Sequence, residues 1–358
     1  MNQYITVVAG KSGGHIIPGL TLAQHIQQQY PEIRIHCITT NTALDHAIVS
    51  QAHYVERHVA LPLSSFSLRA WWKYPYYLGT LVYSCLRIIV QLLWYRPQRI
   101  ISMGGLVSVP VVYLGWLLHI PVELYELNAV PGKAILATAR CAQKVHVCFK
   151  QSQRYFNASK CVLSSYPIRF KQPSHSTLAA RIALKLEPTL PTLLIVGGSQ
   201  GSLWINNHIK KWIEQTKPTN FQIIHQTGAQ DFNNWQSFYN EHRIAAQVFS
   251  FSNAIEHYYQ AADVIVARAG AGTLFEIAHF NKQCIIIPLE VHTTNHQIDN
   301  AHAFAQDYPT ITTVLLQQSV EKNNLLLFNA LNYKLLHAAG LYEKNNNNIA
   351  SDPIHTTI

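Results

Sequence analysis

The stretch VVAGKSGGHIIPG, residues 7–19, gathers three glycines, a lysine, a serine and a histidine into six consecutive positions. Its Gly10–Ser12 segment matches the end of a P-loop, but that motif needs another glycine five residues earlier, where this chain has Ile5. The pattern G-x-G-x-x-G also fails, because the glycines stand at 10, 13 and 14. An apolar strand, a glycine-rich turn and a helix opening at Pro18 remain. Backbone N–H groups and a positive helix end at one spot suit an anion; an ordinary strand-to-helix turn is the alternative.

Three further segments that follow apolar stretches are rich in small residues: MGGLVSVP (103–110), VGGSQGS (196–202) and ARAGAGTLFEIA (267–278). In the last of them Gly270 and Gly272 open a predicted helix, and Glu276 follows one turn later. A glycine-rich helix N-terminus can hold a diphosphate, and a carboxylate one turn further on can accept hydrogen bonds from two ribose hydroxyls. The pattern predicts a nucleoside-diphosphate site made without a P-loop, although Glu276 by itself could be an ordinary helix-face residue.

Metal-ligand patterns are missing from the sequence. No D-x-D occurs, and no histidine–carboxylate cluster has the spacing of metal ligands. If a diphosphate leaves during the reaction, its charge must then be met by backbone N–H groups, a helix dipole and Arg268. We therefore expect metal-independent chemistry without a cofactor.

Composition limits the class of protein. The 358 residues are enough for two domains, and 48% hydrophobic residues support two cores. Lys plus Arg outnumber Asp plus Glu by 27 to 18, which indicates anionic partners such as phosphates, anionic lipid or nucleic acid. The six cysteines form no C-x-x-C pair, which favours reduced thiols in a cytoplasmic protein, and the N-terminus shows no signal peptide.

The segment from residue 57 to residue 122 is basic, aromatic and free of Asp and Glu. Its basic residues are Arg57, Arg69, Lys73, Arg87, Arg96 and Arg99, and aromatic residues are interleaved with them. An anionic bilayer surface selects this combination, and we expect Trp71, Trp72, Lys73 and Arg87 on a membrane face. Alternatively, residues 57–122 form part of an ordinary hydrophobic core with a solvated rim. Nucleic acid is a poorer match because it would not need so many aliphatic residues.

Within that segment, residues 76–94 form a candidate apolar helix. The polar positions Thr80, Ser84, Arg87 and Gln91 recur at steps of four, three and four, which predicts one narrow polar stripe. A central arginine would cost about 2.5–3.5 kcal/mol in lipid. We therefore expect a helix that packs on the protein or lies in a membrane surface rather than one that spans the bilayer.

Short apolar strands alternate with amphipathic stretches along the chain, which predicts an α/β fold with parallel sheets. The expected organisation is a Rossmann-like domain over residues 1–163, a linker over 164–190 with two prolines, and a second Rossmann-like domain over 191–342, the two facing a cleft. The last helix is a candidate for packing back on the first domain. The asparagine-rich tail, 343–358, is expected to be disordered.

The ordered set GKSGGHIIPGL, NAVPG (128–132), GGSQGS, HQTG (225–228), RAGAGTLFEIA and HQIDNA (296–301) resembles the MurG family of glycosyltransferases. The resemblance implies a GT-B fold and inverting transfer of N-acetylglucosamine from UDP-N-acetylglucosamine to the 4-hydroxyl of the muramyl-pentapeptide on undecaprenyl diphosphate. It implies peptidoglycan synthesis at the cytoplasmic face of the bacterial inner membrane, with other cell-wall synthesis proteins as candidate partners and no nucleic acid.

The resemblance also implies which residues contact UDP-N-acetylglucosamine. They are Ser12, Gly13, Gly14, Asn128, Arg169, Ser199, Ser252, Ala271, Gly272, Thr273, Leu274, Phe275, Glu276, His296 and Gln297. His15 is the candidate general base, because a histidine titrates near the working pH. Positioning of the loop or of a phosphate is the alternative for His15, and Glu126 is a rival base or a sugar-positioning carboxylate. His225 either supports the edge of its domain or is a packing residue.

Departures from the family pattern affect both the acceptor side and the expected uracil contacts, where Ser252 replaces a common aliphatic residue and His296 a common glutamine. Tyr125 and Leu127 stand where polar residues are common in the family. Three other functions remain open: a related GT-B lipid glycosyltransferase with another acceptor, an inactive protein that binds a lipid intermediate, and a UDP-sugar epimerase. The epimerase would not need a basic, amphipathic surface.

Overall fold

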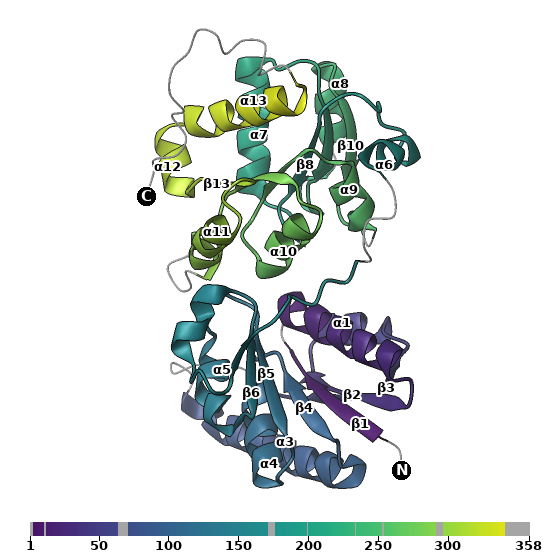
Figure 1. Cartoon of the computed structure of the whole chain (residues 1–358), viewed down its shortest axis with the longest axis vertical. Helices are drawn as coiled ribbons and strands as arrows, with labels where there is room; N and C mark the ends of the chain where they lie inside the picture. Colours follow the sequence, from purple (N-terminus) through teal and green to yellow (C-terminus); the bar gives the residue numbers. More distant parts are fainter. Residues whose placement is uncertain are drawn as a thin grey trace. The chain divides into compact units, whose positions relative to one another are not determined.

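The computed structural model describes residues 3–10, 12–63, 71–170, 176–198, 200–232, 234–252, 254–290 and 296–340, with Trp71 described by its backbone alone. The chain divides into two compact units, Met1–Arg169 and Phe170–Ile358, which we call the N-terminal and C-terminal units (Figure 1). The tail over 343–358, Lys11 and Ser199 lie outside the described residues.

The N-terminal unit is built on a seven-stranded parallel sheet in the order β3-β2-β1-β4-β5-β6-β7. Its strands are β1 (Gln3–Val8), β2 (Ile33–Thr40), β3 (Val55–Leu61), β4 (Arg99–Ser102), β5 (Val122–Glu126), β6 (Lys144–Val147) and β7 (Cys161–Leu163). Its helices are α1 (Gly13–Gln29), α2 (Ala43–Ser50), α3 (Tyr74–Tyr95), α4 (Ser108–Leu117) and α5 (Lys133–Thr138). Helix α1 packs on α2, and α4 packs on both α3 and α5. The central strands are almost wholly buried, as parallel strands covered by helices must be.

The C-terminal unit repeats this plan with six parallel strands in the order β10-β9-β8-β11-β12-β13. They are β8 (Thr192–Val196), β9 (Gln222–Gln226), β10 (Ala245–Phe249), β11 (Val264–Ala267), β12 (Gln283–Ile286) and β13 (Thr312–Val314). The helices are α6 (Thr177–Ala183), α7 (Leu203–Thr216), α8 (Trp235–Glu241), α9 (Ile255–Ala261), α10 (Ala271–His279), α11 (His296–Asp307), α12 (Gln317–Lys322) and α13 (Leu325–Ala338). Its core joins these strands to α7, α8 and α13 around the fully buried Trp212.

In each sheet the strand order reverses once, between β1 and β4 in the N-terminal unit and between β8 and β11 in the C-terminal unit. Open α/β sheets bind ligands outside the carboxyl ends of the strands at such switch points. The four glycine-rich segments of the sequence follow these four strands. The topology therefore brings them together in pairs, one pair in each unit.

Two features differ from the sequence-based expectation. Helix α1 begins at Gly13 and contains Pro18, so Gly13, Gly14 and His15 lie in its first turn instead of before it. Part of the expected linker is structured: α6 is capped by Ser176, packs on α9, and belongs to the C-terminal unit. Short capped helices are difficult to recognise in a proline-punctuated segment, because their few residues show no clear periodicity.

Candidate functional site

The turn after β1 ends in the first turn of α1. Ser12 is the N-cap, and its hydroxyl makes no capping bond to a backbone N–H but lies 3.0 Å from Nδ1 of His15. Ser12, Gly13 and His15 are half-buried, Gly14 is exposed, and the first turn holds no acidic residue. The serine hydroxyl therefore orients the imidazole, and the helix N-terminus keeps its positive character.

The two glycine turns of the N-terminal unit touch through their backbones. A Cβ at Gly105, where φ is +84°, would lie 3.3 Å from the carbonyl oxygen of Gly10. A Cβ at Gly10 would lie 2.9 Å from the backbone nitrogen of Thr40. A side chain at Gly105 would press on the Gly10 turn, and one at Gly10 would press on the end of β2, so both positions favour glycine. The switch point between β1 and β4 is thus lined by backbone.

Glu126 ends β5 and is 2% exposed. Its Oε1 accepts hydrogen bonds from the backbone N–H of Asn128 at 2.8 Å and from Asn128 Nδ2 at 3.2 Å. Its Oε2 accepts from the backbone N–H of Gly132 at 2.8 Å. Both carboxylate oxygens are thus used to close the NAVPG turn, and this holds Asn128 at the edge of the sheet.

His15 and Glu126 lie at the same carboxyl edge of the sheet but on different strands. β1 and β5 are separated by β4, so the two strand ends are about 10 Å apart at the usual spacing of neighbouring strands. The two candidate bases therefore follow different strands of this edge.

The first glycine turn of the C-terminal unit is closed by backbone contacts. The N–H of Gly201 donates to the carbonyl of Gly198 at 3.0 Å, and both glycines have positive φ. A Cβ at Gly201 would lie 2.3 Å from the carbonyl oxygen of Thr227, and one at Gly228 would lie 2.2 Å from that of Gln200. GGSQGS and HQTG are thus two turns packed on each other, which explains why both are rich in glycine.

Arg268 fills the base of the switch point between β8 and β11. It donates to the Ser202 hydroxyl at 2.8 Å and 3.1 Å, to the Ile287 carbonyl at 3.1 Å, and to Gln317. Its guanidinium lies 5.6 Å from the ring centroid of Trp204. Burial lowers the pKa of Arg268 to about 10, against the partial compensation of Glu290. The expected part of Arg268 in meeting the diphosphate charge does not match this position, because its hydrogen bonds tie together the loops that follow β8, β11 and β12.

The second glycine turn of this unit opens α10. Gly270 is the N-cap with an extended backbone, and no acidic residue lies in the first turn. Ala271, Gly272 and Thr273 are half-buried at the helix N-terminus, and Leu274 is fully buried and anchors the helix. Phe275 and Glu276 are half-buried in the second turn. The N-terminus of α10 therefore offers backbone N–H groups at the carboxyl edge of the sheet, with one carboxylate a turn away.

The other predicted donor contacts are spread over neighbouring loops. Gln297 Oε1 accepts from the backbone N–H of Leu289 at 2.9 Å, and Nδ1 of His296 is buried without a hydrogen-bond partner among the described residues. Ser252 accepts from the backbone N–H of Ala254 at 3.1 Å in the loop after β10. Arg169 is exposed and ends the N-terminal unit.

His225 is a fully buried histidine in β9. Its Nδ1 lies 2.8 Å from the Tyr239 hydroxyl, and its Nε2 lies 3.0 Å from Oδ1 of Asn206. Burial lowers the pKa of His225 to about 3, so the ring is neutral at pH 7. Asn206 in turn donates to the Thr227 carbonyl at 3.0 Å and to Asp231 at 2.8 Å. His225 thus supports the turn after β9 through Asn206. It is therefore both a packing residue and a support of the edge of its domain, the two interpretations offered by the sequence.

Helix α3 presents its apolar side to the surface. Its buried residues are Ser84, Ile88 and Leu92, and Ser84 belongs to the predicted polar stripe. Its exposed large hydrophobic residues are Tyr74, Tyr76, Leu78, Val82, Tyr83, Leu86, Val90, Leu93 and Trp94, of which Trp94 is 80% exposed. Arg87 is half-buried and donates to the Tyr83 hydroxyl at 3.2 Å. A surface helix of a globular protein normally has the opposite orientation.

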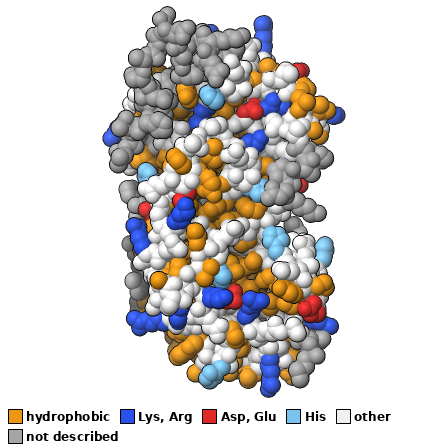
Figure 2. Space-filling model, viewed as in Figure 1, with side chains coloured by type: hydrophobic (Ala, Val, Ile, Leu, Met, Phe, Trp, Pro, Cys, Tyr) orange, Lys and Arg blue, Asp and Glu red, His pale blue; other side chains and the backbone are white. Residues whose placement is uncertain are grey.

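The region around α3 shares this character. Trp72 and Lys73 before the helix are exposed, and so are Tyr113, Trp116 and Leu117 of α4. Figure 2 shows hydrophobic and basic side chains together at the surface over α3 and α4, in the lower part of the view. Among the described residues, α3 alone is long and apolar enough to cross a membrane, and 22% of its most apolar window is buried.

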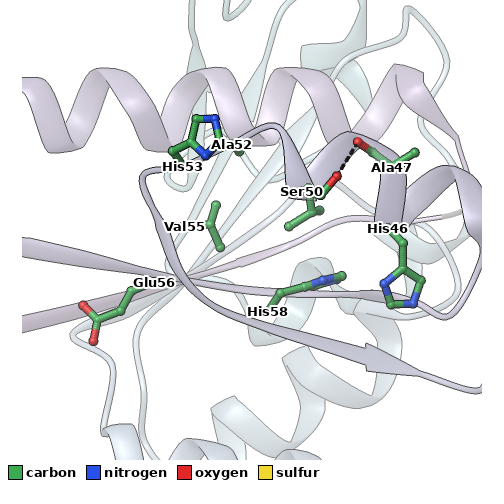
Figure 3. A pocket seen from close by; sticks show the side chains of 9 residues that line it. His46, Ala47, Ser50, Ala52, His53, Val55, Glu56 and His58 are labelled. Carbon is green, nitrogen blue, oxygen red and sulfur yellow. Dashed lines mark hydrogen bonds between the residues drawn. The ribbon is translucent and has the colours of Figure 1, made fainter.

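A separate open hollow of about 700 Å³ lies between α2 and β3 (Figure 3). His46 and His58 lie side by side at one end of it, in edge contact with ring centroids 5.2 Å apart, and His53 lies at its other end. Burial, followed by the charge of His46, lowers the pKa of His58. No three His, Cys, Asp or Glu side chains of the described residues lie together as metal ligands would.

Several residues that support the glycine turns by hydrogen bonds were not predicted from the sequence. Thr40 donates to the buried Asp45 beside Gly10, and Ser202 and Gln317 hold Arg268. These contacts follow no recognisable sequence spacing, because the partners meet within a turn or between separate loops. Tyr125 and Leu127, which depart from the family pattern, are both buried, and Tyr125 stacks on His146 at 4.2 Å.

Comparison with known proteins places this geometry in context. Residues 5–147 match the glycosyltransferase family 28 N-terminal domain, and residues 192–355 match the glycosyltransferase family 28 C-terminal domain. The chain is 30% identical over 302 residues to the UDP-N-acetylglucosamine--N-acetylmuramyl-(pentapeptide) pyrophosphoryl-undecaprenol N-acetylglucosamine transferase of Thermodesulfovibrio yellowstonii, covering 83% of this chain and 81% of the relative. It is 27% identical to the Bacillus subtilis protein of the same name, over 89% and 88% of the two chains.

Solved structures agree on the fold. Acinetobacter baumannii MurG superposes with a TM-score of 0.72 at 23% identity, covering 96% of this chain and 95% of that one. The UDP-GlcNAc 2-epimerase of Methanocaldococcus jannaschii reaches a TM-score of 0.58 at 11% identity, covering 98% and 96%. The expected GT-B fold of two Rossmann-like domains is confirmed.

Proposed function

The chain belongs to the MurG family of glycosyltransferases, and from this premise we propose that it transfers N-acetylglucosamine from UDP-N-acetylglucosamine to the lipid-linked muramyl-pentapeptide of peptidoglycan synthesis. The acceptor atom is the 4-hydroxyl oxygen of N-acetylmuramic acid on undecaprenyl diphosphate, and the product is the lipid-linked disaccharide. The observation that gives most support is the pair of glycine turns at the switch point of each sheet, because each pair offers an anion site to one diphosphate-bearing substrate.

The C-terminal unit holds the donor in this proposal. The backbone N–H groups of Ala271, Gly272 and Thr273 at the start of α10 meet the diphosphate, and the Glu276 carboxylate accepts hydrogen bonds from the ribose hydroxyls. The other expected donor contacts, including Ser199, Arg169, Ser252, His296 and Gln297, are part of the proposal. The charge that develops on the departing UDP is met by the α10 N-terminus, so the proposed reaction uses no metal and no cofactor.

The N-terminal unit holds the acceptor and the proposed base. Nε2 of His15 takes the proton of the 4-hydroxyl while that oxygen attacks the anomeric carbon of the donor sugar. The bond from the anomeric carbon to the UDP diphosphate breaks, its electron pair leaves with UDP, and the configuration is inverted. The Ser12 hydroxyl, 3.0 Å from Nδ1, keeps the ring in the orientation that presents Nε2. Gly13 and Gly14 bring backbone N–H groups to the reacting sugar or to the acceptor diphosphate.

Glu126 fits a positioning role in this reaction better than that of a base. Its oxygens already accept three hydrogen bonds, two from backbone N–H groups and one from the Asn128 amide, and its side chain is buried. We infer that it fixes the NAVPG turn so that Asn128 can contact the donor sugar.

The exposed side of α3 is proposed as the membrane face. An interfacial helix buries its apolar side in the boundary between headgroups and acyl chains, and nearby basic residues are attracted to anionic lipid. Trp72, Lys73 and Arg87 lie on or before this helix, and Trp71 belongs to the same proposed face. The enzyme is then peripheral at the cytoplasmic face of the inner membrane, where its acceptor is anchored and where other cell-wall synthesis proteins act.

The decisive experiment mixes the purified protein with UDP-N-acetylglucosamine and a short-chain lipid-linked muramyl-pentapeptide, in EDTA and in MgCl₂, and measures UDP release. We expect acceptor-dependent release at equal rates under both conditions, with a β-linked disaccharide product confirmed by mass spectrometry and NMR. Release only with magnesium would overturn the metal-free mechanism. Turnover only with another lipid acceptor would replace the acceptor assignment, and donor binding without turnover of any acceptor would favour an inactive binding protein.

A further inference from the structure

A small apolar cavity lies in the N-terminal unit between the first turns of α3 and α4. It has a volume of about 190 Å³ and is lined by Leu63, Tyr77, Thr80, Leu81, Leu106, Val109 and Pro110. All of these side chains are half-buried, so the cavity reaches the surface. The Thr80 hydroxyl donates to the Tyr77 carbonyl at 2.9 Å, which removes it as a polar group of the cavity wall.

The cavity lies at the same edge of the sheet as the glycine turns. Leu63 follows the carboxyl end of β3, and Val109 lies in the first turn of α4, just after the loop that leaves β4. Leu106 directly follows Gly105, whose Cβ position is 3.3 Å from the Gly10 carbonyl oxygen. The glycine that makes the backbone contact at the switch point is therefore directly followed by a residue of the cavity wall.

We propose that this cavity binds the first isoprene unit of the lipid-linked acceptor, beside the diphosphate. This inference rests on the proposed function. The acceptor is ordered as sugar, diphosphate and polyprenyl chain, and the N-terminal unit offers in the same order His15, the glycine turns and the apolar cavity. The cavity-lining residues Tyr77 and Leu81 are directly followed in α3 by the exposed residues Leu78 and Val82, so the cavity wall and the exposed apolar side share this helix.

The size of the cavity fits one branched five-carbon unit better than a full acyl chain. An engineered apolar cavity of about 150 Å³ binds benzene and stays dry when empty. A cavity of about 190 Å³ therefore accommodates an isoprene unit, and the rest of the chain passes over α3 toward the bilayer. The enzyme would thereby recognise a polyprenyl diphosphate by its diphosphate and by the first carbons attached to it.

The first test needs no turnover. Wild-type protein is labelled with a farnesyl diphosphate analogue that bears a photoreactive diazirine on its first isoprene unit, and the labelled peptides are mapped. We expect labels at residues 77–81 and 106–110, displaced by farnesyl diphosphate but not by inorganic diphosphate or by a phospholipid. Labels confined to the outer side of α3 at residues 82–94, or equal displacement by phospholipid, would overturn the proposal.

The second test fills the cavity. In Leu81→Trp the KM for a farnesyl-linked acceptor should rise at least tenfold, to that of an acceptor with a methyl group in place of the lipid, while the donor KM stays unchanged. The same exchange at the exposed Leu178 of α6 is the matched control for the larger side chain. An unchanged farnesyl acceptor KM in a folded Leu81→Trp protein would contradict the proposal. If the wild type labels as expected but turns over no acceptor, the proposed transferase function fails and the lipid site stands.

Discussion

At the scale of single residues, variants of Ser12 and His15 distinguish a catalytic role of the imidazole from the positioning role of the serine hydroxyl. We expect His15→Ala to lower kcat by about 10²–10⁴-fold, the usual contribution of a general base, with little change in the donor KM. Ser12→Ala removes only the hydrogen bond that orients the ring, so we expect a loss of about fivefold, the value of a single hydrogen bond. Steady-state kinetics with both substrates varied measures both effects. Equal kcat values for His15→Ala and the wild type would rule out His15 as the base.

Glu126 gives the complementary result. Glu126→Gln leaves a backbone N–H of the NAVPG turn facing an amide NH₂ group, and a buried donor without its acceptor costs about 1–3 kcal/mol. We therefore expect a lower free energy of unfolding in urea and a raised donor KM. His15→Ala, whose side chain is only half-buried, should unfold like the wild type. A Glu126→Gln protein of full stability whose kcat alone collapses would instead identify Glu126 as the base.

Glu276 is tested through the ribose hydroxyls it is proposed to bind. We expect Glu276→Ala to weaken UDP binding by about 10–100-fold, because hydrogen bonds to a charged group contribute about 1.5–3 kcal/mol. Isothermal titration with UDP and with 2′-deoxy-UDP completes a double-mutant cycle, in which the wild type should prefer UDP and the variant should not. Glu256→Ala on the exposed part of α9 is the control. Retained discrimination in the Glu276 variant would remove this residue from the ribose site.

The sequence alone predicted the candidate site residues that belong to a local motif. His15, the glycines and Glu276 could be predicted because a turn followed by a helix imposes a local spacing. The hydrogen bonds of Arg268 and Glu126 could not be predicted, because their partners lie on other strands or beyond a turn whose geometry is set by packing. A charged residue beside a glycine turn looks the same in sequence whether it faces a ligand or the protein interior.

At the scale of elements, the central strands were predictable, and of the four edge strands only β10 was. Ten strands coincide with apolar runs of the sequence, the pattern from which an α/β fold was predicted: β1, β2, β4, β5, β6, β8, β9, β10, β11 and β12. The strands that were missed, β3, β7 and β13, lie at sheet edges and have mixed burial. An edge strand is covered less completely, so its residues do not form the continuous apolar run by which a central parallel strand is recognised.

Helix α3 was likewise predictable only in part. Its length and polar stripe follow from the sequence, but its orientation does not, since the stripe carrying Ser84 is turned inward. We expect the double variant Leu86→Gln/Trp94→Gln to bind anionic vesicles at least tenfold more weakly, because burial of each side chain contributes about 1.5–3 kcal/mol when complete. Vesicle sedimentation measures the loss. Donor binding should not change.

The matched control is Leu178→Gln/Ile182→Gln on α6, which removes two equally exposed aliphatic side chains elsewhere. Salt distinguishes the two contributions to membrane binding, since added NaCl weakens the attraction of basic residues to anionic lipid but not apolar burial. If both double variants sediment as the wild type does, the exposed side of α3 does not contact lipid.

At the scale of the whole molecule, the fold does not identify the reaction. The GT-B architecture is shared with UDP-GlcNAc 2-epimerases at TM-scores near 0.58, so two Rossmann-like units and their switch points are compatible with more than one chemistry. The features that favour a lipid-linked acceptor are additions to that architecture: the outward apolar side of α3 and the cavity beside Leu106. Both lie in the N-terminal unit, whereas the turns proposed to bind the donor lie in the C-terminal unit.

Each unit also contains a buried neutral histidine, and together these predict how stability depends on pH. Burial lowers the pKa of His36 in the N-terminal unit to about 4 and that of His225 in the C-terminal unit to about 3. In the unfolded chain both titrate near 6.5. Below that pH the unfolded state binds protons that the folded state does not, so the free energy of unfolding falls as the pH falls. The slope approaches about 1.4 kcal/mol per pH unit for each histidine, and the fall ends near the folded pKa.

Tryptophan fluorescence can assign this effect to one unit. Trp212 and Trp235 are buried in the C-terminal unit, whereas Trp72, Trp94 and Trp116 of the N-terminal unit are already exposed. Urea unfolding followed by fluorescence at pH 7.5, 6.0 and 5.0 therefore reports chiefly on the unit that holds His225.

We expect His225→Gln to lower the free energy of unfolding at pH 7.5, because the hydrogen bonds of His225 to Tyr239 and Asn206 are disturbed, and to flatten its dependence on pH. His257→Gln, at an exposed histidine of the same unit, should keep the slope of the wild type. A slope that persists in His225→Gln would show that other groups, and not this buried histidine, set the acid sensitivity of the unit.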